Sequence, residues 1–336
     1  MARYSGSISH HRFKIQSYIA VAVALALTIA ACTSSRTEQP AKRQSQIISG
    51  VLYVAPYKAA LNQEDEWKRE GRVDDAKLLE KITSQPIATW ITGDPKSVRQ
   101  QVTDITEKAS VVGKLPILVA YNIPGRDCGA ASAGGAPSLN DYKLWIQEYS
   151  AGLGSRRALI ILEPDAIADS LGRCAVVAKD RYQALSYAIS LLKRDSNAHV
   201  YLDAGNPLWI DNLSKLAQAL KASNIEHADG FSLNVSNFVS TEQNISYGIR
   251  LAGMLGNAHF VIDTARNGRG TATNNYWCNP PGRALGHAPT NNTGLPLVDA
   301  YLWIKRPGES DGDCGRGEPQ PGKWWADYAL QLAKNG

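Results

Sequence analysis

The segment Leu159-Ile160-Ile161-Leu162-Glu163-Pro164-Asp165-Ala166 decides the fold class. Its four consecutive apolar residues are typical of a strand that is buried on both faces, as strands of a parallel sheet are. Pro164 has no N–H group to donate to a neighbouring strand, so the strand has to end before it. Burial at such a strand end raises the pKa of a carboxyl group, which makes Asp165 a candidate general acid. An ordinary acidic turn is the alternative interpretation.

Similar apolar runs recur along the chain, with helix-like segments between most of them. The predicted strands are Val51–Ala55, Ile87–Ile91, Leu115–Tyr121, Ala158–Leu162, His199–Leu202, Gly230–Leu233, His259–Ile262 and Ala300–Ile304. The predicted helices include Pro95–Ala109, Asn140–Gly152, Asp180–Arg194 and Asp211–Ala222, with Asp180 and Asp211 as N-caps. Strands that alternate with helices form a parallel sheet, and eight such units favour a (β/α) barrel over an open sheet. No G-x-G-x-x-G motif follows the first predicted strand, which argues against a dinucleotide-binding fold.

Polar side chains lie at the ends of most of these strands. They are Tyr121, Asp165, Asp203, Asn234, Asp263 and Lys305. In a (β/α) barrel the carboxyl ends of the strands share one rim, and that rim holds the active site. One polar strand end is routine capping, whereas six of them, three being Asp, indicate a catalytic rim. Because the rim lacks a matching set of His or Cys, metal-dependent hydrolysis and Ser-His-Asp chemistry are not expected.

Tryptophans follow several of the strands, namely Trp90, Trp209, Trp277 and Trp303. Flat indole rings beside a groove fit the apolar faces of sugar rings, although core packing is the alternative. Trp277 lies in a polar loop and is expected to be exposed. Carboxylates combined with aromatic platforms are typical of a glycoside hydrolase. The Gly-rich segment Gly129–Gly135 lacks the Lys-Ser/Thr ending of a phosphate loop and is interpreted as a flexible lid.

The amino-terminal segment resembles an export signal. Basic residues precede an uncharged apolar run, Tyr18–Ala31, that is too short to span a bilayer comfortably. The run ends in Ile29-Ala30-Ala31-Cys32, and small residues before a Cys resemble the lipobox of bacterial lipoproteins, in which the Cys is lipidated. We therefore predict a signal peptide at 1–31, a flexible polar tether at 32–46 and a catalytic domain at 47–336. Ordinary cleavage near the same position is the alternative.

The cysteine count indicates disulfides, and the charge distribution argues against a nucleic-acid partner. Besides Cys32, the chain has Cys128, Cys174, Cys278 and Cys314, an even set that indicates two disulfides with three pairings allowed. No CxxC pair or His-rich cluster accompanies them, so a zinc site is not expected and no metal is predicted. Of 36 basic residues three lie before the apolar run, and with 31 acidic residues the rest of the chain is left at +2. Because no Lys/Arg stripe is present, a nucleic-acid partner is not expected.

Several motifs together resemble glycoside hydrolase family 6, whose members are cellulases that act on β-1,4-glucan. They follow the family's order: Tyr121-Asn122-Ile123-Pro124-Gly125-Arg126-Asp127-Cys128-Gly129, Leu162-Glu163-Pro164-Asp165, Tyr201-Leu202-Asp203-Ala204-Gly205, Asn234-Val235-Ser236-Asn237, Asp263-Thr264-Ala265-Arg266-Asn267-Gly268, Trp277-Cys278-Asn279 and Trp303-Ile304-Lys305-Arg306-Pro307-Gly308-Glu309-Ser310-Asp311-Gly312. Each motif is a weak signal alone, and together they are highly specific. The resemblance implies an α/β fold, namely a distorted (β/α) barrel of the TIM-like type with fewer closed strands than eight, in a single domain without a cofactor.

The resemblance also assigns catalytic roles. Asp165 would be the general acid, and Asp127 would keep it protonated by like-charge repulsion while relaying a proton from water. Asp311 would be the base of an inverting mechanism, with a structural ion pair as the alternative. Tyr121 would lie under the sugar at the cleavage point. The family has a water-holding serine after the Arg-Asp-Cys motif, and here the candidates are Ser132 and Ala133.

The same resemblance supplies a substrate-binding set and a disulfide pairing. The predicted binding residues are Trp90, Asp203, Trp209, Asn234, Asn237, Arg266, Trp277, Lys305 and Glu309, with Asp203 buried beneath the sugars. The charges of Arg266 and Lys305 would lower the pKa of Asp311. The family pairs its cysteines as Cys128–Cys174 and Cys278–Cys314.

The expected activity is therefore that of an endo-β-1,4-glucanase. The loop from Asp311 to Lys323 is short, which favours an open cleft over the tunnel of a cellobiohydrolase, the alternative within the family. A glucan-binding lipoprotein without catalysis is the alternative from another class. The expected partner is β-1,4-glucan, the expected state is a monomer, and the only expected membrane contact is an amino-terminal lipid at the cell envelope.

Overall fold

The computed structural model of the protein describes residues 47–271 and 277–336. Within these residues, seven strands form one parallel sheet in which every strand pairs with the next one along the chain. The strands are β1 (Thr89–Ile91), β2 (Ile117–Ala120), β3 (Leu159–Leu162), β4 (His199–Asp203), β5 (Gly230–Leu233), β6 (His259–Asp263) and β7 (Val298–Leu302). The helices are α1 (Lys58–Arg69), α2 (Val73–Thr83), α3 (Pro95–Val111), η1 (Asp127–Gly129), α4 (Leu139–Leu153), α5 (Ala166–Ser170), η2 (Ala175–Val177), α6 (Ala178–Asp195), α7 (Leu213–Ala222), η3 (Ile225–His227), α8 (Thr241–Met254) and α9 (Ala326–Asn335).

The sheet curls into a distorted half-barrel. The flanks of β1 and β7 meet at a single parallel bridge, between Ile87 and Trp303. The Trp90 indole N–H crosses the same seam and donates to the Ile304 carbonyl at 2.8 Å. A distorted barrel with fewer than eight strands was the expectation, and it is confirmed.

One predicted strand is wrong. The segment Val51–Ala55 forms no named strand and contributes only an isolated bridge, between Leu52 and Leu115. That bridge lies before the start of β2, where the short strand β1 does not reach, so the segment occupies a gap at the amino end of the sheet.

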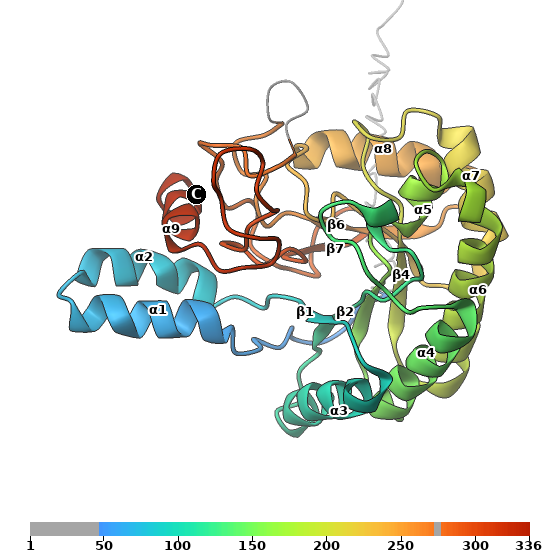
Figure 1. Ribbon diagram of the computed structural model, residues 1–336, viewed down its shortest axis with the longest axis horizontal. Helices are drawn as coiled ribbons and strands as arrows, with labels where there is room; N and C mark the ends of the chain where they lie inside the picture. Colours follow the sequence, from blue (N-terminus) through green and yellow to red (C-terminus); the bar gives the residue numbers. More distant parts are fainter. Residues whose placement is uncertain (1–46, 272–276) are drawn as a thin grey trace, which may run out of the picture. The chain divides into compact units, whose positions relative to one another are not determined.

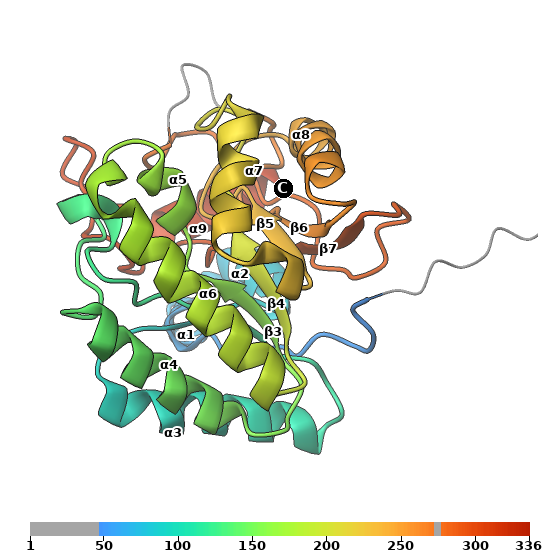
Figure 2. The same ribbon diagram turned by 90° about the vertical axis from the view of Figure 1, so that its right-hand side faces the viewer.

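Both faces of the sheet are buried, which explains the continuous apolar runs. In β3, Ile160 and Leu162 pack toward the surrounding helices, whereas Leu159 and Ile161 fill the interior of the barrel. Helices α3, α4, α6, α7 and α8 lie along the outer side of the strands (Figures 1 and 2). A third apolar cluster holds α1, α2 and α9 together, and there Lys81 donates to the Ala333 carbonyl at 3.0 Å.

Helix starts follow local chemistry, with two corrections to the predicted caps. Helix α3 begins with Pro95 at its first turn and has Asp94 accepting from the Lys96 N–H at 2.8 Å. Asn212, not Asp211, caps α7. Asp180 lies within the first turn of α6, which begins two residues earlier, and there its charge favours the helix dipole.

Two disulfides join loops at the carboxyl side of the sheet. The pairs are Cys128–Cys174 and Cys278–Cys314, as the family resemblance implied. They close segments with sequence separations of 46 and 36 residues, and loops of this size contribute roughly 3–4 kcal/mol each through the unfolded chain. None of the helices in the described ranges combines the length and apolar character that crossing a membrane requires.

Candidate active site

A cleft of about 980 Å³ lies at the carboxyl ends of the strands. Its lining includes all four predicted catalytic residues and six of the predicted sugar-binding residues. These ten are Trp90, Tyr121, Asp127, Asp165, Trp209, Asn237, Trp277, Lys305, Glu309 and Asp311. Parallel strands bring their ends to one rim, which is why residues from distant parts of the sequence meet there.

The turn that carries Asp165 has an unusual backbone. Glu163 and Asp165 have φ angles of +48° and +70° on either side of Pro164. Non-glycine residues rarely adopt this region, and its strain is concentrated at functional sites. The turn is held by Asp203, whose Oδ2 accepts the Asp165 backbone N–H at 2.9 Å. Asp165 is partly exposed to the cleft.

Negative charge surrounds Asp165. Burial raises the pKa of its carboxyl well above the ordinary value, and the charges of Asp203, Asp169 and Asp127 raise it further, in that order. Arg173 acts in the opposite direction. A raised pKa keeps a carboxylic acid protonated and able to donate a proton. The expected repulsion from Asp127 is therefore present, but it is weaker than the contributions of Asp203 and Asp169.

Asp203 is fully buried, in keeping with its expected place beneath the sugars. Besides the Asp165 N–H it accepts from the Gly205 N–H at 3.2 Å and the Ser232 hydroxyl at 3.1 Å. Burial raises its pKa to about 6. Its oxygens therefore hold the backbone of two rim loops and present nothing to the cleft.

Asp127 comes just before the Gly-rich segment Gly129–Gly135, part of which lines the cleft. Its Oδ2 accepts the Ser132 N–H at 2.6 Å, and its Oδ1 accepts from Arg173 at 3.0 Å. The Ser132 side chain is within hydrogen-bonding reach of the Tyr121 phenol. Both Ser132 and Ala133 line the cleft, but only Ser132 brings a hydroxyl to this group.

Arg126 fixes the Gly-rich segment that the sequence presents as a lid. It donates to the Ser132 carbonyl and to the Tyr121 carbonyl, each at 2.8 Å. Its guanidinium carbon also lies 4.4 Å from the centre of the Tyr121 ring. Asp127 and Arg126 therefore both hold the segment Gly129–Gly135 at Ser132, and the Arg126 backbone N–H donates to the Gly134 carbonyl at 3.0 Å.

Asp311 has the opposite surroundings from Asp165. Its Oδ2 lies 2.9 Å from Arg266 Nη1, and its Oδ1 lies 3.4 Å from Lys305 Nζ. Burial raises its pKa, but the charges of Arg266 and Lys305 and the Asn279 N–H outweigh burial and leave the pKa below its ordinary value. Asp311 is thus an anion that borders the cleft. The predicted neighbours and the predicted direction of the pKa are both found.

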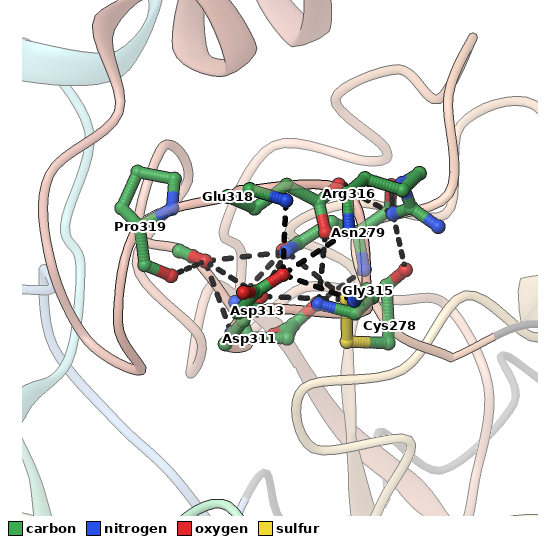
Figure 3. Close-up of a disulfide and its surroundings, with 12 residues drawn as sticks. Cys278, Asn279, Asp311, Asp313, Gly315, Arg316, Glu318 and Pro319 are labelled. Carbon is green, nitrogen blue, oxygen red and sulfur yellow. Dashed lines mark hydrogen bonds and ion pairs between the residues drawn. A yellow bond between two sulfur atoms is a disulfide. The ribbon is translucent and has the colours of Figure 1, made fainter.

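Asn279 organises this carboxylate and was absent from the predicted site. Its backbone N–H donates to Asp311 Oδ2 at 3.1 Å, while its own Oδ1 accepts the Asp311 N–H at 2.7 Å (Figure 3). Its side-chain amide also donates to the Gly312 carbonyl at 2.9 Å. The neighbouring Cys278–Cys314 disulfide links the same two segments (Figure 3).

Aromatic rings edge the cleft. Trp209 and Trp277 are 39% and 54% exposed, which is high for indoles and leaves their faces open. Trp90 is half-buried and meets Tyr121 edge-on, with ring centres 4.9 Å apart. Trp303, grouped with these by its position in the sequence, is buried and donates to the His287 carbonyl at 2.9 Å, so it belongs to the core.

Two other predicted binding residues, Asn234 and Arg266, have side chains that face inward and are absent from the lining of the cleft. Asn234 is fully buried, and its amide donates to the Asp263 carbonyl at 2.8 Å and accepts the Val239 N–H at 3.1 Å. Arg266 is also fully buried, and it divides its donors between Asp311 and the Ser236 carbonyl. Both residues therefore lie behind the wall of the cleft, and the polar atoms named here bond to the protein itself.

Glu163 and the pair Asp169–Arg173 were missed as site residues. Glu163 is buried and accepts the backbone N–H groups of Asn122 and Ile123 at 2.8–3.0 Å, and burial raises its pKa to about 7. Arg173 lines the cleft and pairs with Asp169 four residues earlier at 3.0 Å. That spacing, directly before a cysteine, was the available signal in the sequence.

One group of potential metal ligands occurs among the residues that the structure describes. It consists of Cys128, Asp169 and Cys174. Both sulfur atoms are joined in a disulfide, so they cannot act as the thiolates that a metal would bind.

The fold and this acidic groove edged by indoles define a barrel protein of the glycoside hydrolase kind. Comparison with known proteins is more specific: the profile described as "Glycosyl hydrolases family 6" matches residues 49–336. The chain belongs to glycosyl hydrolase family 6.

Named relatives agree with this membership. The chain is 42% identical over 271 residues to Endoglucanase A of Cellulomonas fimi, covering 80% of this chain and 58% of that protein, so it spans less than two thirds of this relative's length. It is 37% identical over 311 residues to Endoglucanase 1 of Streptomyces halstedii, covering 90% and 93%. Among solved structures, it is similar to the endoglucanase Cel6 of Mycobacterium tuberculosis in complex with methyl-cellobiosyl-4-deoxy-4-thio-β-D-cellobioside. That match has a TM-score of 0.79 and 41% identity, and it covers 87% of this chain and 99% of that one.

Proposed function

We propose that this protein is an endo-β-1,4-glucanase that hydrolyses internal glucosidic bonds with inversion of the anomeric configuration. The observation that carries the proposal is one cleft lined by two carboxyl groups, Asp165 and Asp311, whose surroundings push their pKa values in opposite directions. The endoglucanases matched at 37–42% identity support the same substrate class.

In this mechanism the two carboxyl groups act on opposite sides of the sugar ring. Asp165 donates its proton to the glycosidic oxygen as the bond to the anomeric carbon breaks. Asp311, ionised by its two cations, takes a proton from the water that attacks that carbon from the other face. At the end of the cycle Asp165 is ionised and Asp311 is protonated, and solvent exchanges both protons.

Asp127 and Ser132 would return the proton to Asp165. Asp127 is fixed by the Ser132 N–H, and the Ser132 hydroxyl lies beside Tyr121. We therefore place the water-holding position at Ser132 and not at Ala133, which has no donor or acceptor in its side chain. The Tyr121 ring would form the floor under the sugar that is cleaved.

The exposed indoles would bind the neighbouring sugars. Trp209 and Trp277 offer open ring faces, and Trp90 lies against the floor residue Tyr121. Asn237, Lys305 and Glu309 also line the cleft, where their polar groups would bond to sugar hydroxyls. Stacking contributes about 1 kcal/mol per ring beyond the buried area.

The endo mode rests on the short segment after Asp311. It folds back on itself, because the Ser310 N–H donates to the Lys323 carbonyl and the Gly322 N–H donates to the Ser310 carbonyl, each at 2.9 Å. Little chain is left to roof the cleft, so a glucan could enter along its length. On carboxymethylcellulose we expect viscosity to fall early, while few reducing ends have formed.

The same assay separates the alternatives. Cellobiose as nearly the sole early product, with viscosity preserved, would instead indicate a cellobiohydrolase. Binding of glucan without any release of reducing sugar would indicate a lipoprotein that has lost catalysis. Proton NMR of the first product tests the stereochemistry: the α-anomer is expected from a β-linked substrate, and an initial β-anomer would contradict inversion.

Export and anchoring form a separate proposal, since the segments concerned lie outside the described residues. The apolar run and the Ile29-Ala30-Ala31-Cys32 ending support cleavage after 31 and lipidation of Cys32. A tether to residue 46 would then hold the catalytic domain at 47–336, which we expect to be a monomer, on the envelope. The two disulfides are consistent with an oxidising compartment. Metabolic labelling with a fatty acid should mark the wild type and spare Cys32→Ala; an unlabelled wild type would rule the anchor out.

A further inference from the structure

Arg173 lies between two carboxylates on the acid side of the cleft. One of its terminal nitrogens, Nη2, is 3.0 Å from Asp127 Oδ1 and 3.0 Å from Asp169 Oδ1. The Arg173 side chain is 55% exposed and lines the cleft, whereas the Asp169 side chain is 1% exposed. The disulfide fixes this arrangement, because Cys174 follows Arg173 and Cys128 follows Asp127.

Asp169 also belongs to the surroundings of Asp165. Its backbone N–H donates to the Asp165 carbonyl at 2.8 Å, one turn along α5. Its Oδ2 has no hydrogen-bond partner and lies 3.8 Å from Arg181 Nη1, beyond hydrogen-bonding distance. Asp169 is therefore a buried carboxylate whose direct hydrogen-bonded counter-ion is the half-exposed Arg173.

The other charges that face Asp165 are committed elsewhere. Arg181, from α6, is buried and donates to the Gly125 and Ala166 carbonyls. Asp203, from the end of β4, holds the backbone of the Asp165 turn. Arg126 stacks on Tyr121 and fixes the loop beside it. Among the residues that the structure describes, Arg173 alone forms direct ion pairs with both Asp127 and Asp169.

We propose that Arg173 is a positioning residue that holds Asp127 in place and, as the shared counter-ion of Asp127 and Asp169, sets the pH range over which Asp165 can act as an acid. The proposal rests on the proposed function, in which Asp165 must be protonated for turnover.

The direction of the effect follows from the signs of the charges. Arg173 lowers the pKa of Asp165, so its removal should keep Asp165 protonated to a higher pH and move the alkaline limb of activity upward. Asp169 raises that pKa, so its neutralisation should move the same limb downward. For a charge this exposed, we expect a displacement of roughly 0.5–1 pH unit, less than a buried pair would give.

The experiment measures kcat/KM against pH, because this quantity reports the free enzyme. Arg173→Gln should move the alkaline limb up, Asp169→Asn should move it down, and the double variant should return it toward the wild type. Arg173→Lys keeps the charge but loses the planar fork, so it should leave the limb in place and lower the rate. Arg99→Gln, which removes an exposed arginine paired with Glu148 outside the cleft, is the matched control and should change neither.

A direct titration keeps the inference separate from the proposed activity. Carboxyl ¹³C NMR of Asp165, assigned with Asp165→Asn, should show its pKa rising in Arg173→Gln and the difference shrinking at high salt. If Arg173→Gln and Arg173→Lys both lose rate while the pKa of Asp165 stays unchanged, Arg173 has only a structural role and the proposal is overturned. An inactive wild type whose Asp165 titration still shifts in Arg173→Gln would overturn the proposed function, and of this inference it would leave standing only the charge coupling between Arg173 and Asp165. Should Asp169→Asn fail to fold, the two Arg173 variants decide the question alone.

Discussion

The turn after β3 and the segment after β7 each place one aspartate in the same cleft. Their surroundings shift the pKa values of the two carboxyl groups in opposite directions. Asp165 is set among other carboxylates, whereas Asp311 is set between Arg266 and Lys305. Both groups lose water through burial, which alone would raise either pKa. The comparison shows that the neighbours, and not burial, decide which carboxyl group has the raised pKa and which has the lowered one.

The largest expected effect is the loss of the acid. Asp165→Asn removes the proton donor, and general acid catalysis contributes about 10²–10⁴-fold, so turnover of an unactivated glucan should fall by that factor. A glucoside with a good leaving group needs little protonation, so its turnover should fall much less. Asp180→Asn, a change on the exposed first turn of α6, is the control. A loss under tenfold on glucan would remove Asp165 from the role.

On the Asp311 side of the cleft, the second-largest expected effect is a loss of folding stability. Arg266→Met leaves Asp311 buried with a longer contact to Lys305 as its remaining ion pair. Breaking a buried pair by removing one partner typically costs 3–5 kcal/mol, so urea unfolding should show a loss of about that size. Adding Asp311→Asn removes the stranded charge and should recover part of the loss. Equal losses in the single and double variants would contradict the ion-pair explanation.

Carboxyls with raised pKa values also make stability depend on pH. The pKa of Glu163 rises from 4.5 in the unfolded chain to about 7, so the folded state binds more protons between these values. The free energy of unfolding should therefore be greater at pH 5 than at pH 8, with a contribution from Glu163 of up to about 3 kcal/mol. Asp203 acts in the same direction. In Glu163→Gln the urea midpoints at pH 5 and pH 8 should lie closer together than in the wild type. If the difference between the two midpoints is unchanged, groups other than Glu163 cause the pH dependence of stability.

The smallest expected effect concerns the aromatic edge. Trp277→Ala removes an exposed ring worth about 1 kcal/mol, so KM for soluble cello-oligosaccharides should rise roughly fivefold with kcat nearly unchanged. Trp303→Phe is a useful contrast, because this buried ring should affect the melting temperature and leave KM alone. A KM that does not respond to Trp277 would place the sugar elsewhere in the cleft.

Strand ends were predictable from the sequence because apolar runs locate strands and parallel strands share one rim. The direction of each polar side chain at that rim was not predictable. Asp165 opens into the cleft, while Asp203 and Asn234 turn inward to satisfy backbone groups that the rim leaves without partners. Apolar runs alone did not distinguish the two outcomes, although Asp203 is the last residue of β4, Asn234 follows β5 directly and Asp165 is the third residue after β3. Arg173 was missed because a disulfide, and not a strand, brings it to the site.

The Cys128–Cys174 disulfide has a consequence for how the enzyme matures. Cys128 and Cys174 follow Asp127 and Arg173 directly in the chain, and neither cysteine belongs to a strand of the sheet or to one of the α-helices. Protein produced in a reducing cytosol should therefore show a native far-ultraviolet circular dichroism spectrum before Asp127 and Arg173 are held in place beside Asp165. The secondary-structure content of a recombinant preparation would then not report whether this disulfide has formed. The rise in specific activity during oxidation would report it.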